Sequence, residues 1–181
     1  TAVFSFSLSD YTQVHFDSLT NSTIYRWTLT DSLGTIVNAR ALSQSDASNP
    51  VQNVFELVPG DYQLVISGIG ETQDYSFRLL DVPANSTNIA LDAQTTSVHV
   101  NTRSTNIFNF NAQAGDKVFF ESFSAAGFST IGRWRLFDPF GNEIFGAGLT
   151  TDSGPHTLSS TGTYRLVTEG QPSDTGANGT F

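Results

Sequence analysis

Apolar and polar residues alternate along most of the chain. The pattern is clearest at 4–8 (FSFSL), 25–29 (YRWTL), 62–66 (YQLVI) and 75–79 (YSFRL). Because successive side chains of a β-strand point to opposite faces, a period of two predicts strands with one buried face. Turn residues recur about every ten positions, a spacing typical of a β-sandwich or barrel. We find no convincing helical pattern and therefore expect an all-β fold.

The chain contains two copies of one pattern. Residues 4–6 (FSF), 14–18 (VHFDS), 26–29 (RWTL), 31–34 (DSLG) and 60–65 (GDYQLV) recur as 108–110 (FNF), 118–122 (VFFES), 133–136 (RWRL), 138–141 (DPFG) and 162–167 (GTYRLV). The offset changes only where loops are expected, which is typical of a duplicated unit. We therefore expect two tandem jelly-roll-like antiparallel β-sandwich domains, residues 1–82 and residues 83–181.

The two copies are out of phase with the ends of the chain. Segment 95–100 predicts a strand before that of Phe108, and its counterpart would lie before Thr1. Segment 75–79 closes the first copy, whereas the second copy ends at Phe181, which matches Tyr75. Unpaired edges expose backbone hydrogen-bonding groups. We therefore expect neighbouring sequence to supply both missing strands.

Two pairs of aromatic residues are expected to have structural roles. Trp27 and Trp134 share a strand position with inward-facing leucines, which favours core anchors over sugar-stacking platforms. Tyr62 and Tyr164 each follow a glycine by two residues at the start of a strand. This position indicates a tyrosine corner, in which a buried ring sends its hydroxyl group back to the backbone.

An acidic residue and an arginine recur in both copies. Strand parity points Asp17 and Arg26 outward in the first copy, and Glu121 and Arg133 outward in the second. The loop between the two members differs in length, yet both charges persist. We predict a cross-strand salt bridge in each copy that supports strand register and has no part in catalysis.

Calcium is the one cofactor that the loops suggest. Asp46 and Asp152 lie in polar loops whose oxygen atoms could bind Ca²⁺, but each loop has a single carboxylate. Asp31 and Asp138 begin four-residue turns, and capping of the turn explains them better than calcium does. We expect no other cofactor.

Exposed aromatic residues would be needed for a ligand-binding module. Phe119, Phe128 and Phe140 are the candidates, because they lie in loops or point outward from strands. The alternative for each is packing against the sister domain.

Composition removes several classes of function. The 181 residues contain 8 basic and 17 acidic side chains, for a net charge of −9, which disfavours nucleic-acid binding. No apolar run approaches the ~20 residues of a membrane-spanning helix, so no membrane insertion is expected. The chain has no cysteine, and therefore no disulfide or thiolate metal site. An acidic, cysteine-free chain rich in Ser, Thr and Asn fits an extracellular or cell-surface bacterial protein.

Known catalytic motifs are missing from the sequence. There is no G-x-S-x-G, H-E-x-x-H, P-loop or G-x-G-x-x-G motif. His15, His99 and His156 are far apart in the sequence and do not recur between the copies. We therefore expect that the protein is not an enzyme.

Three segments of the second copy resemble a known family. Residues 114–120 (AGDKVFF), 133–142 (RWRLFDPFGN) and 162–167 (GTYRLV) are similar to bacterial pre-peptidase C-terminal domains, especially the repeated domains of large secreted or cell-surface proteins. The resemblance implies a small jelly-roll-like β-sandwich that is an accessory to an enzyme or adhesin. Some relatives bind calcium, and those of collagenases bind collagen. The first copy departs from this pattern at 9–12 (SDYT).

These observations lead to one expected function and one alternative. The first is a non-catalytic tandem β-sandwich segment of a larger extracellular bacterial protein, acting as a spacer, display or adhesion module. The alternative is a carbohydrate- or protein-binding accessory module of a secreted enzyme. The expected partners are neighbouring repeats of the same polypeptide, together with a surface glycan or protein.

Overall fold

The computed structural model describes residues 1–48, 54–68, 70, 73–130 and 132–181. Within these ranges the protein is all-β and consists of several mainly antiparallel sheets. Two short 3-10 turns, η1 (Leu42–Gln44) and η2 (Asp46–Ser48), are the only helical elements of the described residues. No helix in these ranges is long and apolar enough to span a bilayer.

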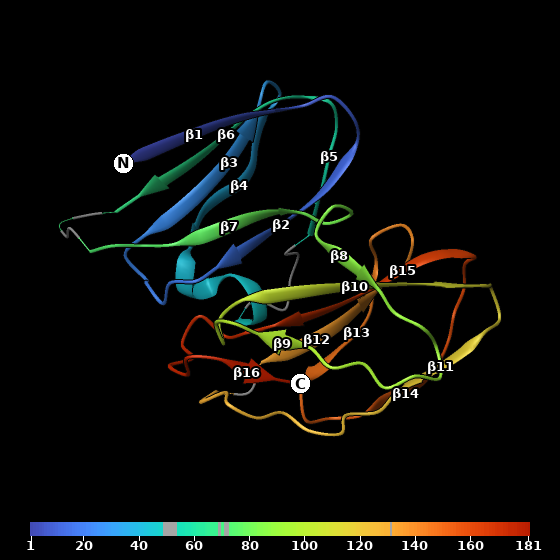
Figure 1. The fold of residues 1–181 in the computed structure, drawn as a ribbon. Coiled ribbons are helices and arrows are strands. Elements are labelled where there is room, and N and C mark those ends of the chain that lie inside the picture. Colours follow the sequence, from blue (N-terminus) through green and yellow to red (C-terminus); the bar gives the residue numbers. More distant parts are fainter. Residues whose placement is uncertain (49–53, 69, 71–72, 131) are drawn as a thin grey trace.

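The first half of the chain forms two sheets (Figure 1). The four-stranded sheet has the order β1 (Ala2–Leu8), β6 (Gly60–Ser67), β3 (Arg26–Asp31) and β4 (Gly34–Ala41). The three-stranded sheet has the order β5 (Val54–Leu57), β2 (Thr12–Ser18) and β7 (Phe77–Asp81). All of these pairs are antiparallel.

Alternating apolar residues from these two sheets meet in one core. Phe16 of β2 stacks on Trp27 of β3, with ring centroids 4.0 Å apart. Trp27 is fully buried, and its indole N–H donates to Ser45 Oγ at 2.9 Å. The predicted role of Trp27 as a core anchor therefore agrees with its position, since a buried indole needs both apolar neighbours and a hydrogen-bond acceptor.

The second half of the chain has one larger sheet and two small ones. The five-stranded sheet has the order β13 (Glu143–Gly148), β12 (Arg133–Phe137), β15 (Gly162–Glu169), β10 (Thr105–Ala112) and β8 (Ser86–Asn88). The pairs β11 (Lys117–Phe120) with β14 (Ser153–Thr157), and β9 (Val98–His99) with β16 (Gly179–Thr180), form the small sheets. The strand predicted at 95–100 is thus limited to Val98–His99.

Trp134 and Tyr164 anchor the core of the second half, and both are buried. The Tyr164 hydroxyl donates to Ser160 O at 2.7 Å, and the Tyr62 hydroxyl donates to Val58 O at 2.6 Å. Each hydroxyl therefore reaches the carbonyl four residues earlier. This is the return to the backbone that a tyrosine corner requires.

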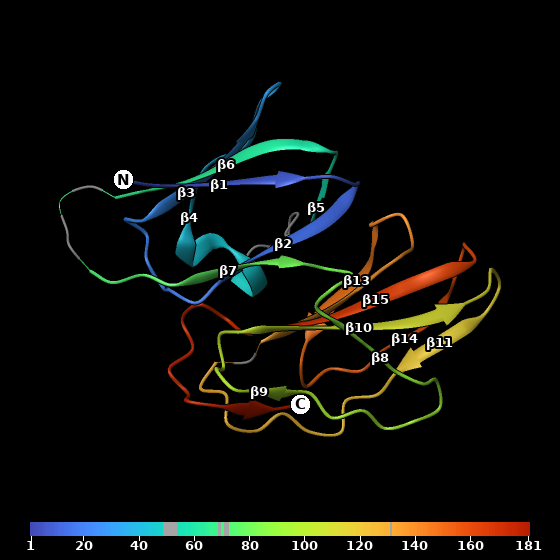
Figure 2. The same ribbon diagram turned by 45° about the horizontal axis from the view of Figure 1, so that its top comes forward.

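The two halves meet face to face. The β5-β2-β7 sheet lies against the five-stranded sheet in both views of the ribbon (Figures 1 and 2). A third apolar cluster, separate from the two cores, contains Leu80 and Val82 from the first half and Ile107, Phe137 and Val167 from the second. Apolar burial therefore continues across the seam between the halves.

The predicted cross-strand salt bridges are wrong. Asp17 lies on β2 and Arg26 on β3, and these strands belong to different sheets. Asp17 is buried against Arg78 instead, while Arg26 donates to Ala39 O at 2.9 Å. Parity shows which face of its own sheet a residue occupies, but consecutive strands need not be neighbours.

The same error applies to the second copy. Glu121 immediately follows β11, which pairs with β14, whereas Arg133 lies on β12 in the five-stranded sheet. No ion pair joins Glu121 to Arg133 among the residues that the structure describes. No contact shared by the two copies therefore explains why these charges recur.

Candidate functional site

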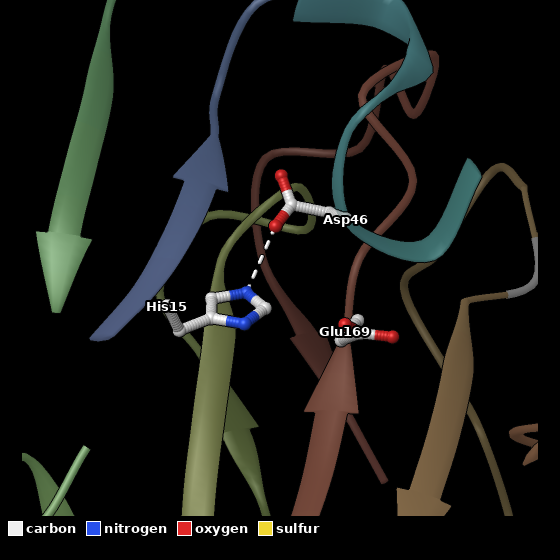
Figure 3. Close-up of side chains that lie close together, drawn as sticks. All are labelled: His15, Asp46 and Glu169. Atoms are coloured by element: carbon white, nitrogen blue, oxygen red, sulfur yellow. Dashed lines mark hydrogen bonds and ion pairs between the residues drawn. The ribbon is translucent and has the colours of Figure 1, made fainter. Parts of the chain in front are cut away.

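A cluster of ionisable side chains lies in the seam between the halves. His15 comes from β2, Asp46 begins η2, and Glu169 ends β15; all three are fully buried (Figure 3). One potential ligand atom from each lies within 4.8 Å of those of the other two. In the described part of the chain this is the one group of His, Cys, Asp and Glu side chains close enough to hold a metal ion.

The backbone of Asp46 brings its carboxylate into this cluster. Asp46 has φ of 55°, in the left-handed region that Asp and Asn tolerate better than most residues. One carboxylate oxygen, Oδ1, lies 2.9 Å from His15 Nε2. A dashed line marks this contact in Figure 3. The other oxygen accepts the backbone N–H of Ser18. The side chain thus joins the 3-10 turn to strand β2.

Arg135 connects the cluster to the second half. This fully buried residue of β12 donates from Nη2 to the Asp46 carbonyl at 3.0 Å. Its Nε lies 2.8 Å from Glu169 Oε2, and its Nη1 lies 3.7 Å from Glu143 Oε2. One guanidinium therefore binds a backbone oxygen of the first half and a carboxylate of the second.

A second ion pair extends the network along the seam. Arg78 of β7 lies with Nε 2.5 Å from Asp17 Oδ2 and donates from Nη2 to Thr105 O at 2.9 Å. The Thr105 hydroxyl lies 3.4 Å from His15 Nε2. The outer face of the three-stranded sheet, which parity predicts to be solvent-exposed, is in fact covered by β10 of the second half.

Burial controls the protonation of these groups. Removal from water raises the pKa of Asp46 well above its usual value, and the nearby carboxylates of Asp17 and Glu169 raise it further. Burial also raises the pKa of Asp17, against the opposing effect of Arg78. Burial lowers the pKa of His15, although Glu169 and Asp17 act in the opposite direction. A neutral His15 hydrogen-bonded to a protonated Asp46 fits these directions.

The donor set is chemically able to bind a metal ion, but its surroundings oppose this. One imidazole nitrogen and two carboxylate oxygens suit Zn²⁺ or a similar cation. Arg135 already lies against Glu169, so a cation would compete with the guanidinium for that carboxylate. With no exposed surface on His15, Asp46 or Glu169, the arrangement suits a cross-link between the two halves better than turnover of a substrate.

The structure also contains two Ser–His contacts that the sequence did not indicate. Ser97 Oγ lies 3.2 Å from His99 Nε2, and His99 Nδ1 lies 2.8 Å from Ser104 O. Ser97 and His99 are buried. Ser153 Oγ lies 2.9 Å from His156 Nε2 at the start of β14. A serine nucleophile needs a base that a third group orients. Within the described ranges only the buried pair has such a group, the Ser104 carbonyl.

The predicted calcium ligands lie in different surroundings. Asp46 belongs to the seam cluster, and Asn49 of its loop lies outside the described residues. Asp152 is exposed, and its Oδ1 accepts the backbone N–H of Ser122 at 2.8 Å. Asp31 and Asp138 accept backbone N–H groups within their own turns, as turn capping predicts.

The three candidate aromatic residues do not form one surface. Phe119 is 55% exposed at the edge of β11, and Phe140 is 69% exposed in the turn between β12 and β13. Phe128 is half-buried and meets the His99 ring edge-on, with centroids 5.2 Å apart. Of the three, only Phe119 borders an apolar groove.

Sequence reasoning predicted neither the seam cluster nor its members His15, Glu169 and Arg135 as functional residues. The one available signal was a difference between the copies, because an outward-facing histidine at position 15 corresponds to a phenylalanine at position 119. That difference indicates that the outward faces of the strands containing His15 and Phe119 differ, but it does not show which residues cover either face.

Comparison with known proteins adds no relative. The chain matches no protein-family model and no curated protein. The resemblance to pre-peptidase C-terminal domains therefore remains an expectation from the sequence.

Proposed function

We propose that the chain is a non-catalytic tandem segment of a larger extracellular bacterial protein. In this proposal, two jelly-roll-like sandwiches, residues 1–82 and 83–181, form one stiff unit that acts as a spacer, display or adhesion module. The observation that carries the proposal is the seam, where polar contacts from Arg135 and Arg78 and an apolar cluster join the two halves.

The composition of the seam explains why the unit would be stiff. Interfaces between domains of one chain usually permit relative motion unless they are large and apolar. Here the apolar cluster around Val82 and Val167 is combined with directional contacts from Arg135 and Arg78. Opening the seam would leave the carbonyls of Asp46 and Thr105 without the guanidinium donors of Arg135 and Arg78, and lost hydrogen bonds to charged groups are costly.

The placement of the histidines supports a non-catalytic role. His15 and His99 are fully buried, so a substrate could not reach either ring without opening the fold. His156 is half-buried, with its ring stacked on Phe145 at 4.9 Å and its Nε2 near Ser153. Among the residues that the structure describes, no carboxylate hydrogen-bonds to this ring to orient it as a base.

Calorimetry tests the proposed unit. If the seam couples the halves, the full chain unfolds in one transition whose calorimetric and van't Hoff enthalpies agree. Two separate transitions would contradict the stiff unit.

Hydrolysis assays on ester, peptide and glycoside substrates test the non-catalytic part of the proposal, with Ser97→Ala and Ser153→Ala as matched variants. Activity that either substitution abolishes would overturn it.

A further inference from the structure

Strand β11 has one open edge. Its counterpart by internal repeat is β2, because residues 14–18 (VHFDS) align with 118–122 (VFFES). Strand β2 pairs with β5 on one side and with β7 on the other. Among the residues described, β11 pairs with β14 alone, and β14 corresponds to β5. The edge of β11 that corresponds to the β7 side of β2 therefore has no partner strand in the described part of the chain.

The backbone of this edge is available for strand addition. The carbonyl of Asp116 accepts from Leu158 N, and the N–H of Ser122 donates to Asp152, so even-numbered residues face the β14 side. Backbone groups alternate along a strand. The N–H and C=O groups of Phe119 and Glu121 therefore point to the open edge. In β2 the same alternation directs Gln13 O to Val82 N, beside β7.

An apolar groove of about 400 Å³ lies along this open edge, bounded on its far side by segment 89–97. In the first half, the ring of Phe77 fills the equivalent place, at centroid distances of 5.4 Å from Phe4, 5.2 Å from Phe16 and 6.4 Å from Tyr75. The counterparts of these three neighbours line the groove: Phe108, Phe120 and Phe181. The groove is therefore lined by the counterparts of the residues that surround the Phe77 ring in the first half.

Charge adds a further requirement. Asp17 on β2 binds Arg78, the residue that follows Phe77 on β7. The counterpart of Asp17 is Glu121, an exposed carboxylate that borders the groove. A strand placed here with the register of β7 would set its own central residue opposite Glu121. A basic side chain at that position would be favoured.

We propose that this groove binds an extended peptide with an apolar–basic–apolar sequence, added antiparallel to the open edge of β11. The main chain of the peptide would bond to the N–H and C=O groups of Phe119 and Glu121. Its two apolar side chains would enter the groove, and its basic residue would meet Glu121. This is strand addition to a sheet edge, in which main-chain bonds give affinity and alternate side chains give specificity.

A peptide with the sequence of residues 74–82 (DYSFRLLDV) is the direct probe, because it has the proposed pattern. Fluorescence anisotropy of the labelled peptide with the full chain should show saturable binding, and the amide resonances of Phe119 and Glu121 should shift. The matched control peptide replaces the residues equivalent to Phe77 and Leu79 by Asp. Absence of binding by the first peptide, or equal binding by the control, would overturn the proposal.

Two substitutions at Phe119 separate the backbone from the ring. Phe119→Pro removes the N–H on the open side and leaves the β14 side unchanged, and proline is tolerated at strand edges. It should weaken peptide binding about tenfold or more, whereas Phe119→Ala should change it by about threefold or less. Circular dichroism checks that both variants fold. Equal affinities for the two variants would contradict strand addition.

Charge exchange and self-association complete the test. A peptide with Glu in place of the basic residue should bind the wild-type chain about threefold more weakly, and Glu121→Lys should restore its affinity. Failure of that rescue would contradict the assigned register. Sedimentation of the chain alone should show a monomer. A dimer that Phe119→Pro dissociates would mean that a second copy occupies the edge, and this would overturn the proposal of a peptide with the apolar–basic–apolar pattern.

Discussion

Replacing Asp46 tests the seam cluster at the carboxylate that joins the η2 turn to strand β2. In Asp46→Ala, the buried N–H of Ser18 loses its acceptor, and His15 Nε2 loses its nearer partner and keeps only the Thr105 hydroxyl at 3.4 Å. Each unsatisfied buried group costs ~1–3 kcal/mol. Alanine at a φ of 55° costs about 1 kcal/mol more. We expect a loss of about 3–7 kcal/mol in the free energy of unfolding, a large part of the ~5–15 kcal/mol typical of a domain.

Asp46→Asn is the matched control. Asparagine also tolerates the left-handed region, and its amide oxygen can still accept the Ser18 N–H. Its NH₂ group can donate to neutral His15, as a protonated aspartate would. We therefore expect Asn to cost less than about 1 kcal/mol at pH 5, against several for Ala. Urea denaturation of both variants and the wild type, followed by tryptophan fluorescence, measures the difference.

The raised pKa of Asp46 also predicts how the stability difference between Asp46→Asn and the wild type changes with pH. Burial raises the folded-state pKa of Asp46 above its ordinary value of 3.8, so the folded protein holds this proton more tightly than the unfolded chain does. The resulting stability is fully present below pH 3.8 and is lost as the pH rises through the folded pKa. Asparagine does not titrate, so Asp46→Asn should gain stability relative to the wild type as the pH rises above about 4.

Two results would refute this reasoning. Equal stability of the Ala and Asn variants would mean that the Asp46 side chain does not satisfy the buried groups. If Asp46→Asn loses stability relative to the wild type as the pH rises, folded Asp46 is ionised and its pKa is lowered, not raised.

Three further predictions address the remaining contacts. Arg78→Met removes the ion-pair partner of buried Asp17 and should lower the free energy of unfolding by about 2–4 kcal/mol. This is less than the usual loss for a buried pair, because Arg78 is 39% exposed. In the same denaturation assay, the control Arg26→Met should cost less than about 0.5 kcal/mol. Tyr164→Phe removes the hydroxyl that donates to Ser160 O and accepts from Ser160 N, and should cost about 1–2 kcal/mol. The melting temperature of Tyr11→Phe, at an exposed site, should match the wild type. Addition of EDTA should leave the melting temperature unchanged, and a drop of several degrees would show that a bound cation stabilises the fold.

Local pattern predicted the local structure well. Alternation identifies the strands of Phe16, Trp27 and Tyr164, and the shared positions of Tyr62 and Tyr164 predict their return to the backbone, because these contacts lie within a few residues of each other. The all-β class follows from the same pattern. Nothing in the pattern sets the order of strands in each sheet, so the pairing of Asp17 with Arg26 failed.

The seam could not be predicted for a related reason. Parity correctly places His15 on the face of β2 opposite to Phe16, but whether that face meets water depends on residues about 90 positions away, such as Thr105. The bond from Arg135 to the Asp46 carbonyl also joins residues 89 positions apart. Such contacts have no periodic signal in one sequence.

The distance distribution between the two halves tests the stiff unit most directly. The chain has no cysteine, so Leu33→Cys and Val100→Cys create the only two sites for thiol spin labels; these residues are 91% and 83% exposed, one in each half. Double electron–electron resonance should give one narrow distance distribution that high salt does not change, because the seam contacts are buried and weakly screened. A broad or multimodal distribution would mean that the halves move independently, which would contradict the proposed spacer.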